Sequence, residues 1–239
     1  MRMRWPLMLS LVLMLLALTA FRGPSSALSA GSEYRFRVES EATTTVGGKT
    51  VSTTSEEELV VRVDSVKGSN VSYTIYHPIL GTTKSWTLKN QSFVTVIGGA
   101  FDVDKDGYAE WCWFDLSADF FVNSDWDKHK TAWNSSISAI KAMSCVQGVE
   151  DSTGGGEFYA KITAKIEVDL DGDGEDEKGK YTAVLKATYD EDGVLKSLMR
   201  DEKMEFEEEG LGHTYRVALK RYKPITIFGF ELPTIPPLE

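Results

Sequence analysis

Residues 158–168 have the sequence FYAKITAKIEV, and this stretch decides the fold class because apolar and polar side chains alternate along all of it. A period of two places one set of side chains on a dry face and the other on a wet face, which is typical of a half-buried β-strand. The dry set is Phe158, Ala160, Ile162, Ala164, Ile166 and Val168, and the wet set is Tyr159, Lys161, Thr163, Lys165 and Glu167.

The same pattern continues on both sides of this stretch. Residues 181–189 alternate in the same way, and the following DEDG at 190–193 has the chemistry of a hairpin turn. We expect further strands at residues 34–38, 49–66, 71–76, 85–89, 93–97, 194–206 and 213–222. The sequence therefore predicts a mainly β (α+β) protein with a large, curved antiparallel sheet of roughly eight to ten strands.

One segment has a helical period instead. Four apolar residues recur there at helical spacing, namely Trp126, Trp133, Ile137 and Ile140. Ser124, with Asp127 three residues later, is a suitable N-cap. We predict one amphipathic helix over Asp125–Ser144, lying on the dry face of the sheet.

Residues 151–156, which include three consecutive glycines, form a flexible connection in this interpretation. The connection is either a domain boundary or a loop within one domain. The four strands expected after it have a single apolar face that needs a covering layer, which favours one β-rich domain over residues 31–239. The concave face of its sheet is either a filled core or a pocket.

The first 30 residues differ from the rest of the chain. They contain Arg2, Arg4 and Arg22, no acidic residue, and an apolar run over residues 5–21 that precedes several small residues. This pattern indicates a secretory signal, with cleavage after Ala27 or Ala30. The alternative is an uncleaved anchor, for which the run is short because a bilayer core requires ~20 apolar residues. In both cases we expect the protein to be secreted or held in the cell envelope.

The remaining chain is strongly acidic. Without the three arginines of the first segment, 23 basic residues face 36 acidic ones, a formal net charge of −13. Such a charge disfavours nucleic acid and anionic lipid as partners. No second apolar run follows, so no further membrane span is expected. Frequent Glu and Lys with only two Gln residues favour a thermophilic host.

Two cysteines and three sequons are consistent with an exported protein. An even cysteine count outside the cytoplasm predicts a disulfide between Cys112 and Cys145, with two buried free thiols as the alternative. Asn70, Asn90 and Asn134 each begin an Asn-x-Ser sequon and permit N-glycosylation where the host has the machinery.

Two nine-residue segments carry the most specific chemistry. Residues 102–110 (DVDKDGYAE) and 169–177 (DLDGDGEDE) both follow the pattern D-x-D-x-D-G-x-x-E. In such a loop the alternating aspartates converge, the glycine makes a sharp turn, and a carbonyl and a final acid add oxygen ligands. An all-oxygen site without His or Cys suits Ca²⁺ rather than Zn²⁺.

Both segments resemble the Asp-rich calcium loops of EF-hand, dockerin, thrombospondin type 3 and integrin-type repeats. The resemblance implies two Ca²⁺ ions and ten ligand positions: Asp102, Asp104, Asp106, the carbonyl of Tyr108, Glu110, Asp169, Asp171, Asp173, the carbonyl of Glu175, and Glu177. Trp113 and Lys180 stand at position 12, where an EF-hand needs a bidentate Glu, so we expect ions at hairpin tips rather than paired EF-hands. The alternative is an ordinary acidic turn.

No catalytic motif stands out. His77, His129 and His213 have no metal-binding spacing, and no nucleophile or phosphate-binding motif is found, which favours a non-catalytic protein. Trp111 and Trp113 share a strand face beside the first loop; we expect them, with Trp126 and Trp133, to pack in the core rather than to stack on sugars.

We therefore expect an exported calcium-binding structural or binding module. A hydrophobic-ligand carrier is the first alternative, since a curved sheet with a covering helix resembles the half-barrels of lipoprotein carriers. A carbohydrate-binding module or glycan-acting enzyme is the second.

Overall fold

The computed structural model describes residues 28–68, 70–78, 80–88, 93–169, 176–208, 210–223, 226–227 and 230–231. Residues 28–30 are the only described part of the expected signal or anchor segment. Asn90 and most of the second aspartate-rich loop also lie outside the described residues. Within the described part of the chain, no helix has the length and apolar character needed to cross a bilayer.

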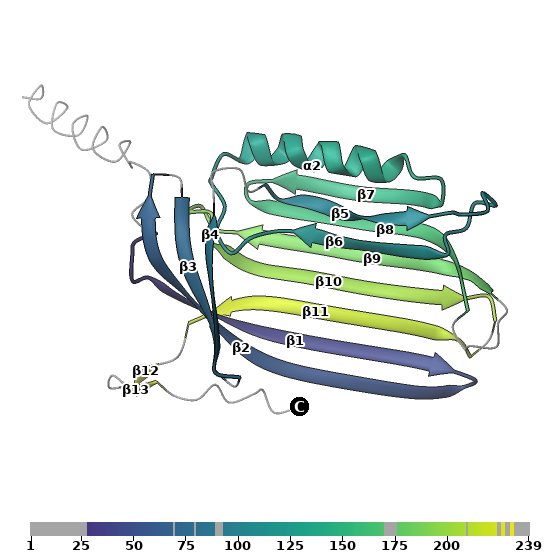
Figure 1. The fold of residues 1–239 in the computed structure, drawn as a ribbon, viewed down its shortest axis with the longest axis horizontal. Coiled ribbons are helices and arrows are strands. Elements are labelled where there is room, and N and C mark those ends of the chain that lie inside the picture. The colour runs from purple at the N-terminus through teal and green to yellow at the C-terminus, as the bar shows by residue number, and fades with distance from the viewer. Residues whose placement is uncertain are drawn as a thin grey trace, which may run out of the picture.

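The protein is mainly β, as the alternation predicts, and is built on one nine-stranded antiparallel sheet (Figure 1). The order of its strands is β4-β3-β2-β1-β11-β10-β9-β8-β7. These strands are β1 (Glu33–Val46), β2 (Lys49–Lys67), β3 (Asn70–His77), β4 (Thr82–Leu88), β7 (Val146–Gly154), β8 (Glu157–Val168), β9 (Glu177–Tyr189), β10 (Leu195–Phe206) and β11 (Gly212–Tyr222).

Two antiparallel meanders make up this sheet, and the pairing of β1 with β11 joins them. Their ladder runs from Arg35 opposite Tyr222 to Thr45 opposite Gly212. Strands from both sides of residues 151–156 therefore belong to one sheet. Those residues are not a flexible connection, because Asp151–Gly154 finish β7 and Gly155-Gly156 make a tight turn into β8 with φ angles of 58° and 86°.

A second layer covers one part of the dry face. It consists of the hairpin of β5 (Thr95–Phe101) and β6 (Trp111–Ser117), which among the described strands pair only with each other, and of α2 (Trp126–Lys141). Figure 1 shows this layer over the β7–β9 side of the sheet. The end of β2, with β3 and β4 beside it, turns upward at the left of the view. A further short pair is formed by β12 (Thr226–Ile227) and β13 (Phe230–Glu231). The strand expected at 93–97 thus leaves the main sheet.

The helix is shorter than predicted and lies at the edge of the dry face beside β7 and β5. Asp125 is the N-cap instead of Ser124, and its carboxylate accepts a hydrogen bond from the Lys128 N–H. The helix ends at Lys141 because the chain must turn to enter β7, where the Cys145 carbonyl accepts a bond from the Lys165 N–H. Its buried side chains are His129, Trp133, Ile137 and Ile140.

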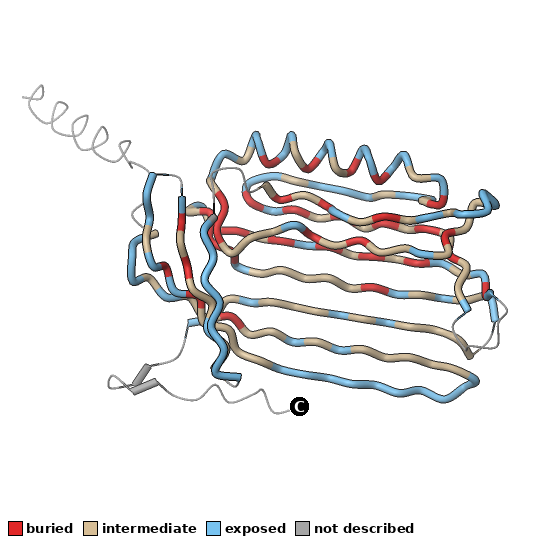
Figure 2. The backbone as a smooth tube through the Cα atoms, viewed as in Figure 1, coloured by how far each residue is buried: buried red, intermediate tan, exposed pale blue. Residues whose placement is uncertain are grey.

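The core lies between these two layers, and Figure 2 shows buried residues gathered under them. The dry sets of β8 and β9 are almost wholly buried, which confirms the alternation in the sequence. On β1 and β2 the core continues through Phe36, Val61 and Val63. Toward the β1–β2 turn and along β11 the same face becomes mixed, with polar side chains beside partly buried apolar ones such as Val38 and Leu219. Three cross-strand hydrogen bonds mark this change, between the side chains of Ser40 and Ser55, Thr44 and His213, and His77 and Glu57. The dry face is therefore a filled core where it is covered and a mixed polar and apolar surface elsewhere.

Candidate metal centre

The first aspartate-rich segment is the loop that joins β5 to β6. The backbone takes left-handed φ angles at Lys105 (67°) and at Gly107 (91°). Glycine adopts such angles without steric cost, which explains its place at the sharpest point of the loop. The turn brings alternate side chains of the loop to one side.

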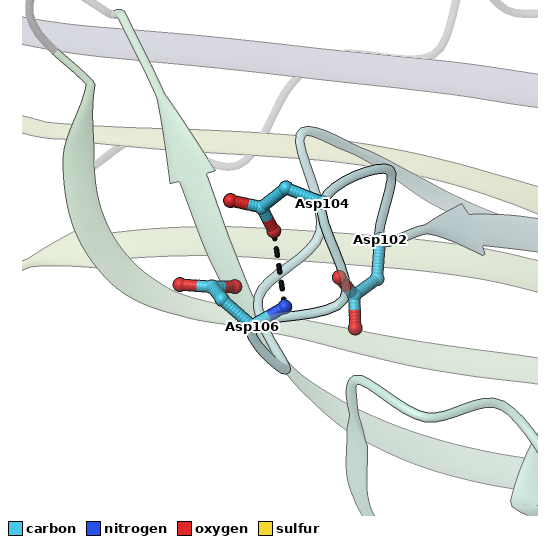
Figure 3. Close-up of side chains that lie close together, drawn as sticks. All are labelled: Asp102, Asp104 and Asp106. Atoms are coloured by element: carbon cyan, nitrogen blue, oxygen red, sulfur yellow. Dashed lines mark hydrogen bonds between the residues drawn. The ribbon is translucent and has the colours of Figure 1, made fainter.

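Asp102, Asp104 and Asp106 converge in this loop, with one carboxylate oxygen of each within 4.8 Å of the others (Figure 3). Among the described residues they are the only group of three or more His, Cys, Asp or Glu side chains that converge in this way. The backbone holds them in place. Asp106 N–H donates to Asp104 Oδ1 at 3.0 Å, Gly107 N–H to Asp102 Oδ2 at 3.0 Å, and Tyr108 N–H to Asp106 Oδ1 at 2.8 Å.

Asp102 has one oxygen in an unusual position. Its Oδ2 accepts bonds from the Gly107 N–H and from the Ser144 hydroxyl at 3.3 Å, but its Oδ1 is buried and has no hydrogen-bond partner among the residues that the structure describes. A buried, unsatisfied carboxylate oxygen is costly to maintain. A cation bound through this oxygen would satisfy it.

Lys178, at the start of β9, is a cation already close to the triplet. Its Nζ lies 2.8 Å from Asp106 Oδ2 and 3.1 Å from Glu167 Oε2, and 4.3 Å from the centre of the Tyr108 ring. The hydrogen bond from Lys178 is the main cause that lowers the pKa of Asp106, followed by the bond from Tyr108 N–H. Sequence reasoning missed Lys178, because only the folded chain brings it to a loop 72 residues away.

The structure places Glu110, another expected ligand of this loop, outside the triplet. Both carboxylate oxygens of Glu110 accept the Val103 N–H, at 2.8 and 3.1 Å, and these bonds are the main cause that lowers the pKa of Glu110. Tyr108 contacts the triplet through its N–H. Glu110 thus clamps the two ends of the loop together.

The loop docks at the end of β8, close to where the second aspartate-rich segment begins. Ala109 forms an isolated parallel bridge with Ile166, through bonds from Ala109 N–H to the Lys165 carbonyl and from Glu167 N–H to the Ala109 carbonyl. In the second segment only Asp169, Asp176 and Glu177 are described, and Glu177 is buried opposite Val168. Asp171, Asp173 and Glu175 lie outside the described residues.

The expected disulfide is absent, because both Cys112 and Cys145 are free thiols. Burial is the main cause that raises the pKa of each, and the neighbouring Cys145 raises the pKa of Cys112 further. The two side chains therefore behave as small apolar groups at the core boundary.

The tryptophans divide between core and surface. Trp133 is completely buried, as expected, and Trp126 packs against the core. Trp111 is 53% exposed, so the prediction that it packs in the core is wrong. Trp113 is half-buried beside it, with ring centroids 5.9 Å apart.

The remaining sequence candidates lie apart from the triplet. His77 bonds to Glu57, His213 to Thr44, and His129 is buried on α2. Of the sequon asparagines, Asn70 begins β3 and Asn134 lies on α2, both exposed.

Comparisons with models of protein families, with curated proteins and with solved structures find no match to this chain. The chemistry of the site is therefore the basis for assigning a function to this protein.

Proposed function

We propose that this protein is an exported, non-catalytic calcium-binding module of the cell envelope or extracellular space, in which Ca²⁺ stiffens loops at one end of the sheet. The observation that carries the proposal is the buried Oδ1 of Asp102, which has no partner within the described part of the chain and belongs to a triplet of converging carboxylates. Three carboxylates close together repel one another, and a divalent cation removes that repulsion as well as satisfying the oxygen.

The chemistry of the triplet favours a hard cation. All the converging ligand atoms are carboxylate oxygens, which suit Ca²⁺ with its flexible coordination and need for many oxygens. Extracellular sites of this kind bind Ca²⁺ at ~10⁻⁴ to 10⁻³ M, which gives lasting occupancy outside a cell. The export half of the proposal is supported by the sequence of residues 1–30.

A hydrophobic-ligand carrier receives less support. The uncovered part of the dry face has polar side chains, including Ser40, Ser55 and Thr44. Of two hollows of about 340 Å³ each, one is lined mostly by polar and charged residues, among them Ser40 and Ser55, and the other by both polar and apolar residues. An extended apolar ligand would gain little from such surfaces.

The test compares melting temperatures of the purified chain in millimolar Ca²⁺ and in chelator. We expect Ca²⁺ to raise the melting temperature, since a ligand at about 100 times its dissociation constant stabilises the folded state by ~2.7 kcal/mol. Asp102→Asn should remove the part of the increase that the first loop supplies, and Asp171→Asn the part from the second.

Glu41→Gln is the matched control, because it removes one negative charge from an exposed strand position and should leave the increase intact. Identical melting curves in Ca²⁺ and in chelator, with no calcium bound by calorimetry, would contradict the proposal. Mg²⁺ should be less effective than Ca²⁺ because it demands a smaller octahedral shell.

A further inference from the structure

The β5–β6 hairpin has an aromatic surface on the face turned away from the core. The strand register sets Phe101 opposite Trp111 and Gly99 opposite Trp113, so all four positions share this face. The Phe101 and Trp111 ring centroids are 5.2 Å apart, and those of Trp111 and Trp113 are 5.9 Å apart. Phe101 is 57% exposed and Trp111 is 53% exposed. Phe101, Trp111 and Trp113 are called the aromatic platform below.

Gly99 determines how the rings of the platform lie. A Cβ atom at this position would come within 3.1 Å of the Phe101 ring and 3.7 Å of the Trp111 ring. Both rings therefore lean over the bare backbone of Gly99. A glycine inside a strand weakens the strand, and its presence is explained where another group must approach the backbone closely. Here the groups that approach are the two rings.

Carboxylates stand at both ends of the platform. The triplet of Asp102, Asp104 and Asp106 lies in the loop that connects Phe101 to Trp111. At the other end Asp115, which is paired with Ile97, has a partly exposed carboxylate that also contacts Arg200. The surface therefore combines exposed aromatic rings with flanking hydrogen-bond acceptors.

This combination matches the chemistry of an uncharged sugar. A pyranose ring whose hydroxyls are equatorial has a flat face of C–H bonds that can pack on an aromatic ring, while its hydroxyls donate to carboxylates. The formal net charge of −10 on the whole chain repels anionic lipid and nucleic acid, but it does not repel a neutral glycan. We propose that the aromatic platform binds a neutral glycan built of such pyranose rings.

The platform does not require an ion. Because the loop joins its two exposed rings, Ca²⁺ bound there would hold Phe101 and Trp111 in register and strengthen binding. Glycan binding by the platform and Ca²⁺ binding by the loop can therefore be tested separately in one experiment.

The test titrates the purified full chain with cellohexaose, a neutral β-linked glucose oligomer, by calorimetry in Ca²⁺ and in chelator. Trp111→Ala and Phe101→Ala should each weaken binding up to about tenfold, the upper end of what one aromatic contact contributes. Trp86→Ala is the matched control, since Trp86 is 54% exposed on β4 at the other edge of the sheet. It should leave affinity unchanged, and circular dichroism checks that each variant folds.

Binding that persists in chelator and weakens in Trp111→Ala supports the platform even if the loop binds no calcium. Chitohexaose and mannohexaose are titrated in the same way. If the chain binds none of the three sugars, the glycan proposal is overturned, whatever effect Ca²⁺ has on the melting temperature. An equal loss in Trp86→Ala also overturns it. Binding to phosphatidylserine vesicles in place of glycans, lost in Trp111→Ala, would identify the surface as a membrane contact and overturn the glycan assignment.

Discussion

Lys178 places a positive charge 2.8 Å from a carboxylate oxygen of Asp106, where a divalent cation would experience repulsion. Lys178→Met keeps the length of the side chain and removes the charge. We expect this variant to bind Ca²⁺ up to about tenfold more tightly, because removing the ammonium group removes its repulsion of the divalent ion, which solvent and salt weaken at this exposed position. Calorimetric titration measures the change.

Lys161→Met is the control for this prediction, since Lys161 pairs with Glu150 at an exposed position away from the triplet. Equal calcium affinities in wild type and Lys178→Met would show that Lys178 does not compete with the ion.

His129 is a buried residue whose charge state affects stability. The Val94 N–H donates to Nδ1, and Nε2 bonds to the Asn123 carbonyl, so the ring is neutral with its proton on Nε2. Burial lowers the pKa of His129 below 6.5. The unfolded chain therefore binds the proton more readily, and the stability that neutral His129 contributes is present above pH 6.5 and lost as the pH falls toward its folded pKa.

We expect the free energy of unfolding to fall between pH 7 and pH 5, by at most about 1.4 kcal/mol per pH unit. Urea titrations at several pH values measure it. The His129→Gln variant should be less stable, but its free energy of unfolding should change less with pH. The His213→Gln variant should keep the pH dependence of the wild type. A wild type with constant stability over this range would contradict the prediction.

At the scale of elements, the β9–β10 turn requires glycine at position 193, because a residue with a Cβ atom does not fit there. Its φ is 76°, and a Cβ there would lie 2.0 Å from the Val122 carbonyl oxygen. We expect Gly193→Ala to destabilise the protein by roughly 3 kcal/mol or more, since it combines backbone strain with a backbone clash. Urea denaturation measures the loss.

Gly155, in the β7–β8 turn, is the matched control. It also has a left-handed φ, of 58°, but no atom of the described residues lies within 4 Å of a Cβ placed there. Gly155→Ala should cost only about 1 kcal/mol. Equal costs at the two glycines would mean that the contact between this turn and Val122 does not matter.

Single elements also show which features of the fold the local sequence predicts. The period-two pattern of residues 158–168 and 181–189 identified β8 and β9 and their buried faces, because a strand exposes alternate residues whatever its neighbours are. The bounds of α2 were less accurate. Ser124 and Asp125 are equally good caps by composition, and the start of β7 determines where the helix must end.

At the scale of the whole molecule, the β1–β11 ladder joins the two meanders. We expect urea unfolding, followed by tryptophan fluorescence and by circular dichroism, to give one coincident transition, because neither meander has a complete core without the other. Two separated transitions would show that the meanders fold as independent domains.

Sequence alone determined the fold class, the dry faces of the long strands and the three aspartates that converge, because each depends on spacing within one short segment. It did not determine the pairing of β1 with β11, the departure of β5 and β6 from the main sheet, or the exposure of Trp111. Nor did the sequence determine that Lys178 lies beside Asp106. Strand order, burial and long-range ion pairs arise from which surfaces meet when the chain folds, and local spacing carries no record of that choice.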